Sequence, residues 1–124
     1  MKKGLKHYSE FSDNPFLEDE EVSDISKIIL NLSKAALELM YYIFDTKSFT
    51  EDRFIFDIDE FKRFANKKSD TSAIQSLREL CFVGVIAKTK ISRVYWVNKN
   101  VFLDNKAMGY LKDLLNSKKK NKQK

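Results

Sequence analysis

The strongest pattern of apolar and polar positions along the chain lies between residues 70 and 81. Five small or apolar residues recur there at the 3.6-residue spacing of a helix, which predicts one buried stripe. They are Ala73, Ile74, Leu77, Leu80 and Cys81. The opposite stripe is short and polar, and Asp70 is placed to cap the helix, because a carboxylate accepts hydrogen bonds from the free N–H groups of a first turn. The outward residues are Thr71, Ser72, Gln75 and Arg78, with Ser76 and Glu79 at the borders.

A longer helix and a strand are predicted before this one. Ser33 can cap a helix that runs to Asp45, because apolar residues follow at helical spacing over residues 36–44. Residues 46–52 then form a polar connection. The aromatic and β-branched residues 54–58 predict a short strand.

A short helix leads from this strand to the turn before residue 70. Asp59 is placed to cap it over residues 60–65, which would bury Phe61 and Phe64. Asn66 suits the left-handed residue that often ends a helix. The turn that follows consists of Lys67, Lys68 and Ser69.

The segment after residue 81 predicts a β-hairpin. Gly84 supplies the positive φ that a corner from helix to strand requires. Residues 86–89 and 94–98 have the composition of two strands, and the polar segment between them gives the hairpin a cationic tip. Its cations are Lys88, Lys90 and Arg93. Helix, helix, turn, helix and hairpin in this order predict an α+β fold, the winged helix-turn-helix.

An acidic arm precedes this domain. Residues 1–24 hold Pro15, which is the only proline, and the acidic run 18–21, and we expect them to be partly extended. The run is either solvated surface or an intramolecular mask that competes with DNA for the basic face, and the sequence leaves both readings open. The winged-helix domain spans residues 25–103. At its start, residues 25–32 alternate weakly and fit either a short strand or a lead-in helix.

A last helix and a tail complete the chain. Asp104 can cap a helix over residues 104–116, although Gly109 weakens it by about 1 kcal/mol relative to alanine. One face of this helix is apolar, and it either packs on the first core helix or pairs with its copy in a homodimer. That face carries Met108, Leu111, Leu114 and Leu115. Residues 117–124 predict a disordered basic tail.

Composition narrows the class of protein. The chain has 124 residues, of which 43% are hydrophobic and 13% aromatic, and this is enough for the core of one domain. No apolar run approaches the roughly 20 residues that span a bilayer, and the start lacks the apolar segment of a signal peptide, so we expect a cytoplasmic protein without a membrane partner. With one cysteine, one histidine and three glycines, the sequence offers no recognisable zinc site, phosphate loop or catalytic constellation. We therefore expect no enzyme, no cofactor and no small-molecule ligand.

Charge is the strongest indication of a partner. Residues 1–24 hold 3 Lys against 7 Asp and Glu, whereas residues 66–124 hold 14 Lys and Arg against 4 Asp and Glu. A basic region of this kind favours a polyanion, most simply duplex DNA. The candidate DNA-binding residues come from the turn, the helix and the hairpin. They are Lys67, Lys68, Ser69, Thr71, Ser72, Gln75, Ser76, Arg78, Lys88, Lys90 and Arg93.

Four residues of the outward stripe are candidates for reading bases, with Thr71 and Ser72 at hydroxyl reach beside Gln75. Gln75 lies near the centre of the outward stripe, where a side-chain amide can pair with adenine, and Arg78 could pair with guanine or only with phosphate. A protein-interaction module without DNA binding is the alternative, because many winged helices bind proteins. RNA is disfavoured, since no exposed aromatic platform for splayed bases is evident in the sequence.

Three stretches carry a resemblance to a known family. They are Thr71-Ser72-Ala73-Ile74-Gln75-Ser76-Leu77-Arg78-Glu79-Leu80, Gly84-Val85-Ile86-Ala87-Lys88-Thr89 and Tyr95-Trp96-Val97-Asn98. These residues resemble the winged-helix domain of the RepL family of plasmid replication and maintenance initiators, over about residues 28–104. The resemblance implies origin or operator DNA binding by a small bacterial or mobile-element protein, and it implies no catalysis. A transcriptional repressor is the alternative role.

Overall fold

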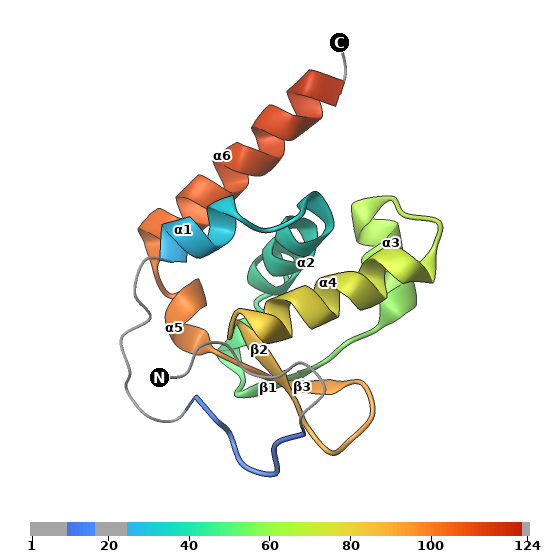
Figure 1. Cartoon of the computed structure of the whole chain (residues 1–124), viewed down its shortest axis with the longest axis vertical. Helices are drawn as coiled ribbons and strands as arrows, with labels where there is room; N and C mark the ends of the chain where they lie inside the picture. Colours follow the sequence, from blue (N-terminus) through green and yellow to red (C-terminus); the bar gives the residue numbers. More distant parts are fainter. Residues whose placement is uncertain (1–9, 17–24, 123–124) are drawn as a thin grey trace.

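The computed structural model describes residues 10–16 and 25–122, with side chains described as far as Ser117 in the last helix. Within these residues the fold is α+β, with six α-helices, one short 3-10 helix and a three-stranded sheet (Figure 1). The elements are α1 (Ile25–Leu30), α2 (Lys34–Asp45), η1 (Ser48–Thr50), β1 (Arg53–Ile55), α3 (Ile58–Ala65), α4 (Asp70–Phe82), β2 (Ile86–Lys88), β3 (Val94–Val97), α5 (Lys99–Phe102) and α6 (Asn105–Lys122).

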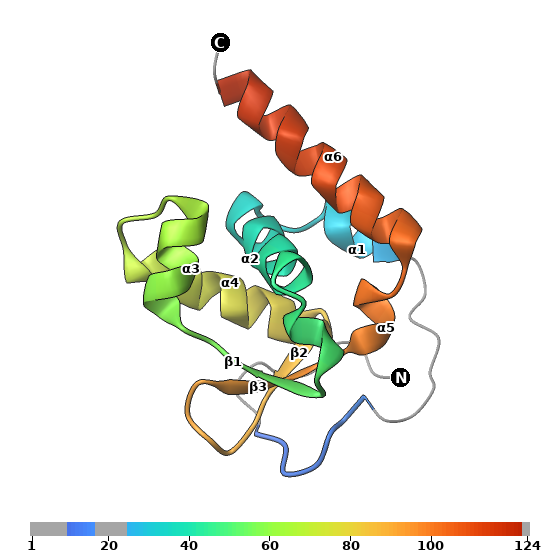
Figure 2. The ribbon, with the colours of Figure 1, turned by 180° about the vertical axis from the view of Figure 1, so that it is seen from behind.

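α4, α2 and α6 lie one above another, with α4 nearest the sheet and α6 farthest from it (Figures 1 and 2). α4 packs between α2 and β2, and α6 packs on α1 and α2. The largest side chains in the core come from all of these layers. Fully buried examples are Ile29, Leu37, Met40, Ile43, Phe61, Leu80, Ile86, Phe102 and Leu111.

The sheet is antiparallel, in the order β1-β3-β2. Tyr95 of β3 lies opposite Phe54 of β1 and opposite Lys88 of β2. The predicted hairpin is therefore confirmed as β2 and β3. The strand predicted before it is β1, which pairs with β3 on the side away from β2. That strand is shorter than expected, covering Arg53–Ile55 rather than residues 54–58, because Asp57 leaves the sheet to cap α3.

Several local predictions are confirmed. The Ser33 hydroxyl caps α2 and accepts from the Ala36 N–H at 3.2 Å. Asn66 ends α3 with φ 57° and ψ 49°, and Gly84 has φ +84° at the corner between α4 and β2. No neighbouring atom crowds Gly84, so glycine is needed there for its backbone angle and not for space.

Two predicted helix caps are wrong by one or two positions. α3 is capped by Asp57, whose carboxylate accepts from the Glu60 N–H at 3.1 Å, and not by Asp59. α4 is capped by Ser69, whose hydroxyl accepts from the Thr71 N–H at 3.0 Å, and not by Asp70. Each predicted cap is instead a first-turn acid, where a negative charge is also favourable.

The structure assigns one segment that the sequence left open and changes the prediction for two others. Residues 25–32, left open between strand and helix, contain α1. The polar connection at residues 46–52 contains η1, where Phe49 stacks between Phe44 and Phe102 with ring centroids 5.8 and 5.6 Å away. α6 continues past residue 116 to Lys122, so the tail predicted to be disordered is helical over most of its length. That segment contains no proline or glycine that would end a helix.

The apolar face of α6 packs against the protein itself. Met108, Leu111 and Leu115 are buried, Leu114 is half-buried, and the Asp104 carboxylate caps the helix by accepting from the Ala107 N–H at 3.0 Å. Of the two partners that the sequence left open for this face, the first core helix is the one observed.

Candidate nucleic-acid interface

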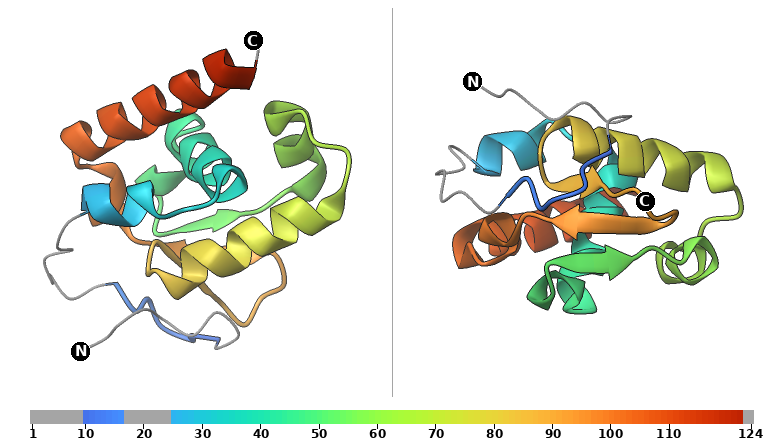
Figure 3. Two further views of the ribbon diagram at one scale, coloured as in Figure 1. Left: turned by 45° about the horizontal axis from the view of Figure 1, so that its top comes forward. Right: turned by 90° about the horizontal axis from the view of Figure 1, so that it is seen from below.

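α4 presents a polar face away from the core. Thr71, Gln75 and Arg78 are exposed and Ser72 is half-buried, as predicted for the outward stripe. Gln75 lies three or four positions from each of the other three, so the four residues lie along one side of the helix. In the views of Figure 3, this helix runs along one side of the molecule next to the hairpin.

The exposure of two residues on α4 is the reverse of the prediction. Ser76 is fully buried, and its hydroxyl donates to the Ser72 carbonyl at 2.7 Å. Ile74 is 44% exposed, although its apolar side chain was assigned to the core. The buried stripe is therefore rotated toward Ser76, a residue small enough to lie within the tight packing between α4 and α2. Ser76 is unavailable as a DNA contact.

Most polar residues at the turn before α4 form contacts within the protein. Ser69 is the cap of α4, and Asp70 forms an ion pair with Lys62 of α3 at 2.7 Å. Lys67 lies 2.9 Å from Glu38 of α2, and both side chains are largely buried. This contact is an ion pair whose geometry does not meet that of a hydrogen bond. Lys67 could reach DNA only by leaving a buried carboxylate, which is costly.

The hairpin loop, residues 89–93, is held in one shape by its own hydrogen bonds. The buried Thr89 hydroxyl donates to the Val94 carbonyl at 2.8 Å and accepts from the Ile91 N–H at 3.0 Å. Arg93 adopts φ 69°, and its carbonyl accepts from the Phe56 N–H at 2.7 Å. These contacts hold the backbone of the loop that carries Lys90 and Arg93 in one conformation.

A groove of about 470 Å³ separates the loop from the starts of α3 and α4. The hairpin contributes Lys88, Lys90 and Arg93, and α4 contributes Asp70 and Leu77. Lys90 and Arg93 are exposed, whereas Lys88 is half-buried. The predicted hairpin cations are thus brought together next to α4. Gln75 and Arg78 are not among the residues that line this groove.

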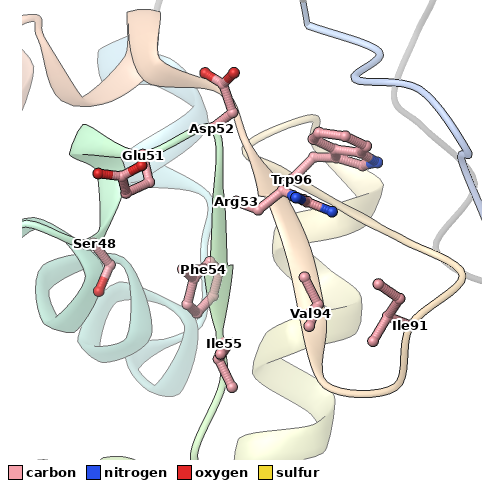
Figure 4. A pocket seen from close by; sticks show the side chains of 9 residues that line it. All are labelled: Ser48, Glu51, Asp52, Arg53, Phe54, Ile55, Ile91, Val94 and Trp96. Carbon is pink, nitrogen blue, oxygen red and sulfur yellow. The ribbon is translucent and has the colours of Figure 1, made fainter.

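A larger hollow of about 900 Å³ lies over β1 and β3 and was not anticipated (Figure 4). The Arg53 guanidinium lies over the Trp96 ring, 5.3 Å from its centroid, while Ile55 and Ile91 are 73% and 58% exposed. The alternation of outward residues along the two strands was the available signal, since every second side chain of a strand shares one face.

Burial or hydrogen bonding raises the pKa of four groups. Burial raises the pKa of the Cys81 thiol to about 12, and burial together with the Glu60 carboxylate raises the pKa of Tyr42 to about 12. Burial also raises the pKa of Tyr95. The hydrogen bond to Asp70 raises the pKa of Lys62. A thiol with such a pKa is protonated at neutral pH and is a poor nucleophile.

The described residues contain no cluster of three His, Cys, Asp or Glu side chains arranged for a metal ion. None of the helices among them has the length and apolar character needed to cross a bilayer. No family model, no curated protein and no solved structure matches this chain. Function is therefore inferred from the geometry of α4 and the hairpin.

Proposed function

We propose that this protein is a winged-helix protein that binds duplex DNA, with α4 in the major groove and the hairpin loop against the sugar-phosphate backbone. The element order and the sheet order β1-β3-β2 are compatible with that fold. A helix fits the width of the major groove, and a helix in that position presents its outward residues to base edges.

The observation that carries the proposal is the combination of a polar outer face on α4 with exposed cations beside it. Gln75 and Arg78 are exposed on the helix, and Lys90 and Arg93 are exposed on the loop. In this arrangement Gln75 pairs with adenine, and the loop cations contact phosphates. Lys68, which is exposed in the turn, adds a third phosphate contact.

The biological role proposed is plasmid or mobile-element replication or maintenance, with transcriptional repression as the alternative. This part of the proposal is supported by the resemblance of α4 and the hairpin to RepL-type initiators. Both roles need the same DNA-binding surface. A homodimer through α6 remains a prediction, and the buried apolar face of that helix gives it little support.

A protein-interaction module is the second candidate, and one observation favours it. Ile74 and Phe82 are 44% and 64% exposed on the outer side of α4. Exposed apolar side chains on a binding face are typical of protein partners, although an aliphatic residue there can also contact thymine methyl groups. DNA is favoured because Arg78, Lys90 and Arg93 have no obvious use in an apolar contact.

The proposal is tested by titrating labelled duplex DNA at several salt concentrations. Each lysine or arginine contact should contribute about −0.9 to the slope of log K against log salt. The double variant Lys90→Gln/Arg93→Gln should weaken binding to all sequences and make the slope shallower by about 2. The matched control Lys106→Gln/Lys112→Gln removes the same charge from the exposed side of α6 and should leave the slope unchanged. Equal effects in the two variants, or binding that is independent of salt, would refute the proposed interface.

A further inference from the structure

A short segment near the N-terminus lies on the outer edge of the sheet. β2 is an edge strand in the order β1-β3-β2, so one side of it has no strand partner from the domain. Glu10 forms a parallel bridge with Lys88, and the Phe11 N–H donates to the Lys88 carbonyl at 2.9 Å. The segment, drawn in blue in Figures 1 and 2, therefore begins to extend the sheet by one strand.

A side chain from the neighbouring strand provides a second anchor. The Trp96 indole N–H of β3 donates to the Phe11 carbonyl at 2.9 Å. Phe11 and Phe16 are half-buried, and the Asn14 side chain accepts from the Phe16 N–H at 2.9 Å to form the turn that follows. Both backbone polar groups of Phe11 are thus satisfied by the hairpin. The contact is specific but small, which is typical of a segment that can open separately from the core.

The same segment brings an acidic residue to the groove of the hairpin cations. Glu10 lines the groove together with Lys88, Lys90 and Arg93. Lys90 and Arg93 are the loop side chains assigned above to phosphates. A carboxylate in that groove repels a DNA backbone and competes with it for the same cations.

We propose that the outer edge of β2 and the Trp96 indole form a strand-docking site, that residues 10–16 of this chain are its occupant, and that duplex DNA displaces them. The displacement step rests on the proposed DNA binding, whereas the docking step does not. Covering an exposed strand edge with a segment of the same chain is a known way to protect it, and adding a strand to an edge is a common mode of peptide recognition. Competition is reciprocal, so weakening the docked segment must strengthen DNA binding, by a factor no larger than the factor by which docking is weakened.

Trp96 is the only tryptophan in the chain, so its fluorescence reports the docking step directly. Phe11→Ala should shift the emission of the protein without DNA, because the segment leaves the indole. The matched change Asp13→Asn, at an exposed position of the same segment that does not line the groove, should leave it unchanged. An emission spectrum that is identical in all three proteins would overturn the docking site.

DNA titrations then test the displacement. Adding duplex DNA to the wild type should shift the emission toward that of Phe11→Ala, and Phe11→Ala itself should show little further change. Glu10→Gln and Phe11→Ala should each raise affinity at least about fivefold, whereas Asp13→Asn removes one charge outside the groove and should change it less. DNA binding with unaltered emission, or equal affinity gains from Glu10→Gln and Asp13→Asn, would overturn the displacement. A wild type that does not bind DNA refutes the proposed function and the displacement together, while the docking result stands by itself.

Discussion

α4 carries polar residues on both of its faces. Those on the inner face form hydrogen bonds within the protein, whereas most of those on the outer face are exposed to solvent. On the inner face, Ser76 is fully buried and donates to the Ser72 carbonyl, and Glu79 accepts from both the N–H and the hydroxyl of Ser33 at 2.8 and 2.7 Å. On the outer face, Gln75 is exposed, and its side chain makes no hydrogen bond to the described residues. A polar residue is thus available to a ligand only when the fold does not already use its donors and acceptors.

The cations divide in the same way. Lys62 and Lys67 lie within 3 Å of Asp70 and Glu38, respectively. The first pair connects α3 to α4, and the second connects the turn before α4 to α2. Lys90 and Arg93 are exposed at the hairpin loop, where the described residues show no ion pair for them. The charges of Lys62 and Lys67 therefore have a structural use, whereas charge at the loop remains available for a partner.

The contrast between the two faces should appear first in stability. Leu80 is fully buried on the inner face, so Leu80→Ala should lower the free energy of unfolding by about 2–5 kcal/mol. Ile74→Ala removes a similar volume from the outer face and should change it by less than about 0.5 kcal/mol. Urea denaturation of both variants measures this difference. Similar losses would mean that Ile74 is covered in solution, by a second chain or by another part of this one.

Burial of the inner face should also make the stability of the protein depend on pH in alkaline solution. The Cys81 thiol has its pKa raised from 9.0 to about 12 by burial, so above pH 9 the unfolded state releases a proton that the folded state keeps. Stability is therefore complete below pH 9 and falls as pH rises toward 12. Between pH 9 and 11 the loss should be on the order of 2 to 3 kcal/mol, with Tyr42 adding to it above pH 10.

Thermal denaturation across this pH range tests the effect, with Cys81→Ala as the comparison. That variant is destabilised at neutral pH, but its stability should depend less on pH between 9 and 10. Thiol labelling gives an independent measure, because native Cys81 should react slowly until the protein unfolds. Rapid labelling of the native protein at pH 8 would contradict the burial of this thiol.

The sequence predicted the elements better than it predicted the use of their residues. The helix at α2, the left-handed Asn66, the corner at Gly84 and the β2–β3 hairpin follow from local rules of periodicity and backbone angle. Such rules act over a few residues, so one chain is enough to apply them. The sequence did not distinguish a helix from a strand at α1, because a helix of six residues has too few turns for its period to be clear.

The site was less predictable because its residues are assigned by distant contacts. Glu79 meets Ser33 across 46 positions of the chain, and Trp96 meets Phe11 across 85. Lys67 was counted with the DNA contacts because nothing in its neighbours indicates Glu38 as a partner. Gln75 faces outward as predicted, whereas the burial of Ser76, at the border of the stripe, depends on how α2 lies against α4.

The outer face can be tested by base reading. Gln75→Ala should cost about 1–3 kcal/mol at the preferred site and relax discrimination at one base position, because paired hydrogen bonds to adenine are lost. Nonspecific affinity should barely change, since the phosphate contacts of Lys90 and Arg93 remain. Site selection from random duplexes with the wild type and the variant in parallel measures this. Identical preferences would return Gln75 to the class of solvated surface residues.

The smallest effect is expected at Glu79, where the inner face is closest to solvent. This carboxylate accepts twice from Ser33, whose hydroxyl also accepts from the Ala36 N–H as the cap of α2. In Glu79→Gln the side chain loses the charge that strengthens both bonds and keeps only one acceptor oxygen, so stability should fall by about 1 kcal/mol. Ser33→Ala removes the cap and should cost a similar amount.

The double variant shows whether the two residues act together. If Glu79 stabilises α2 through Ser33, Glu79→Gln/Ser33→Ala should be less destabilised than the sum of the single variants, with a coupling of at least about 0.5 kcal/mol. DNA affinity should be maintained in Glu79→Gln, because this side chain is directed at α2 and not at a ligand. Strict additivity would mean that the contact contributes nothing, and a loss of DNA affinity would place Glu79 on the outer face with Gln75.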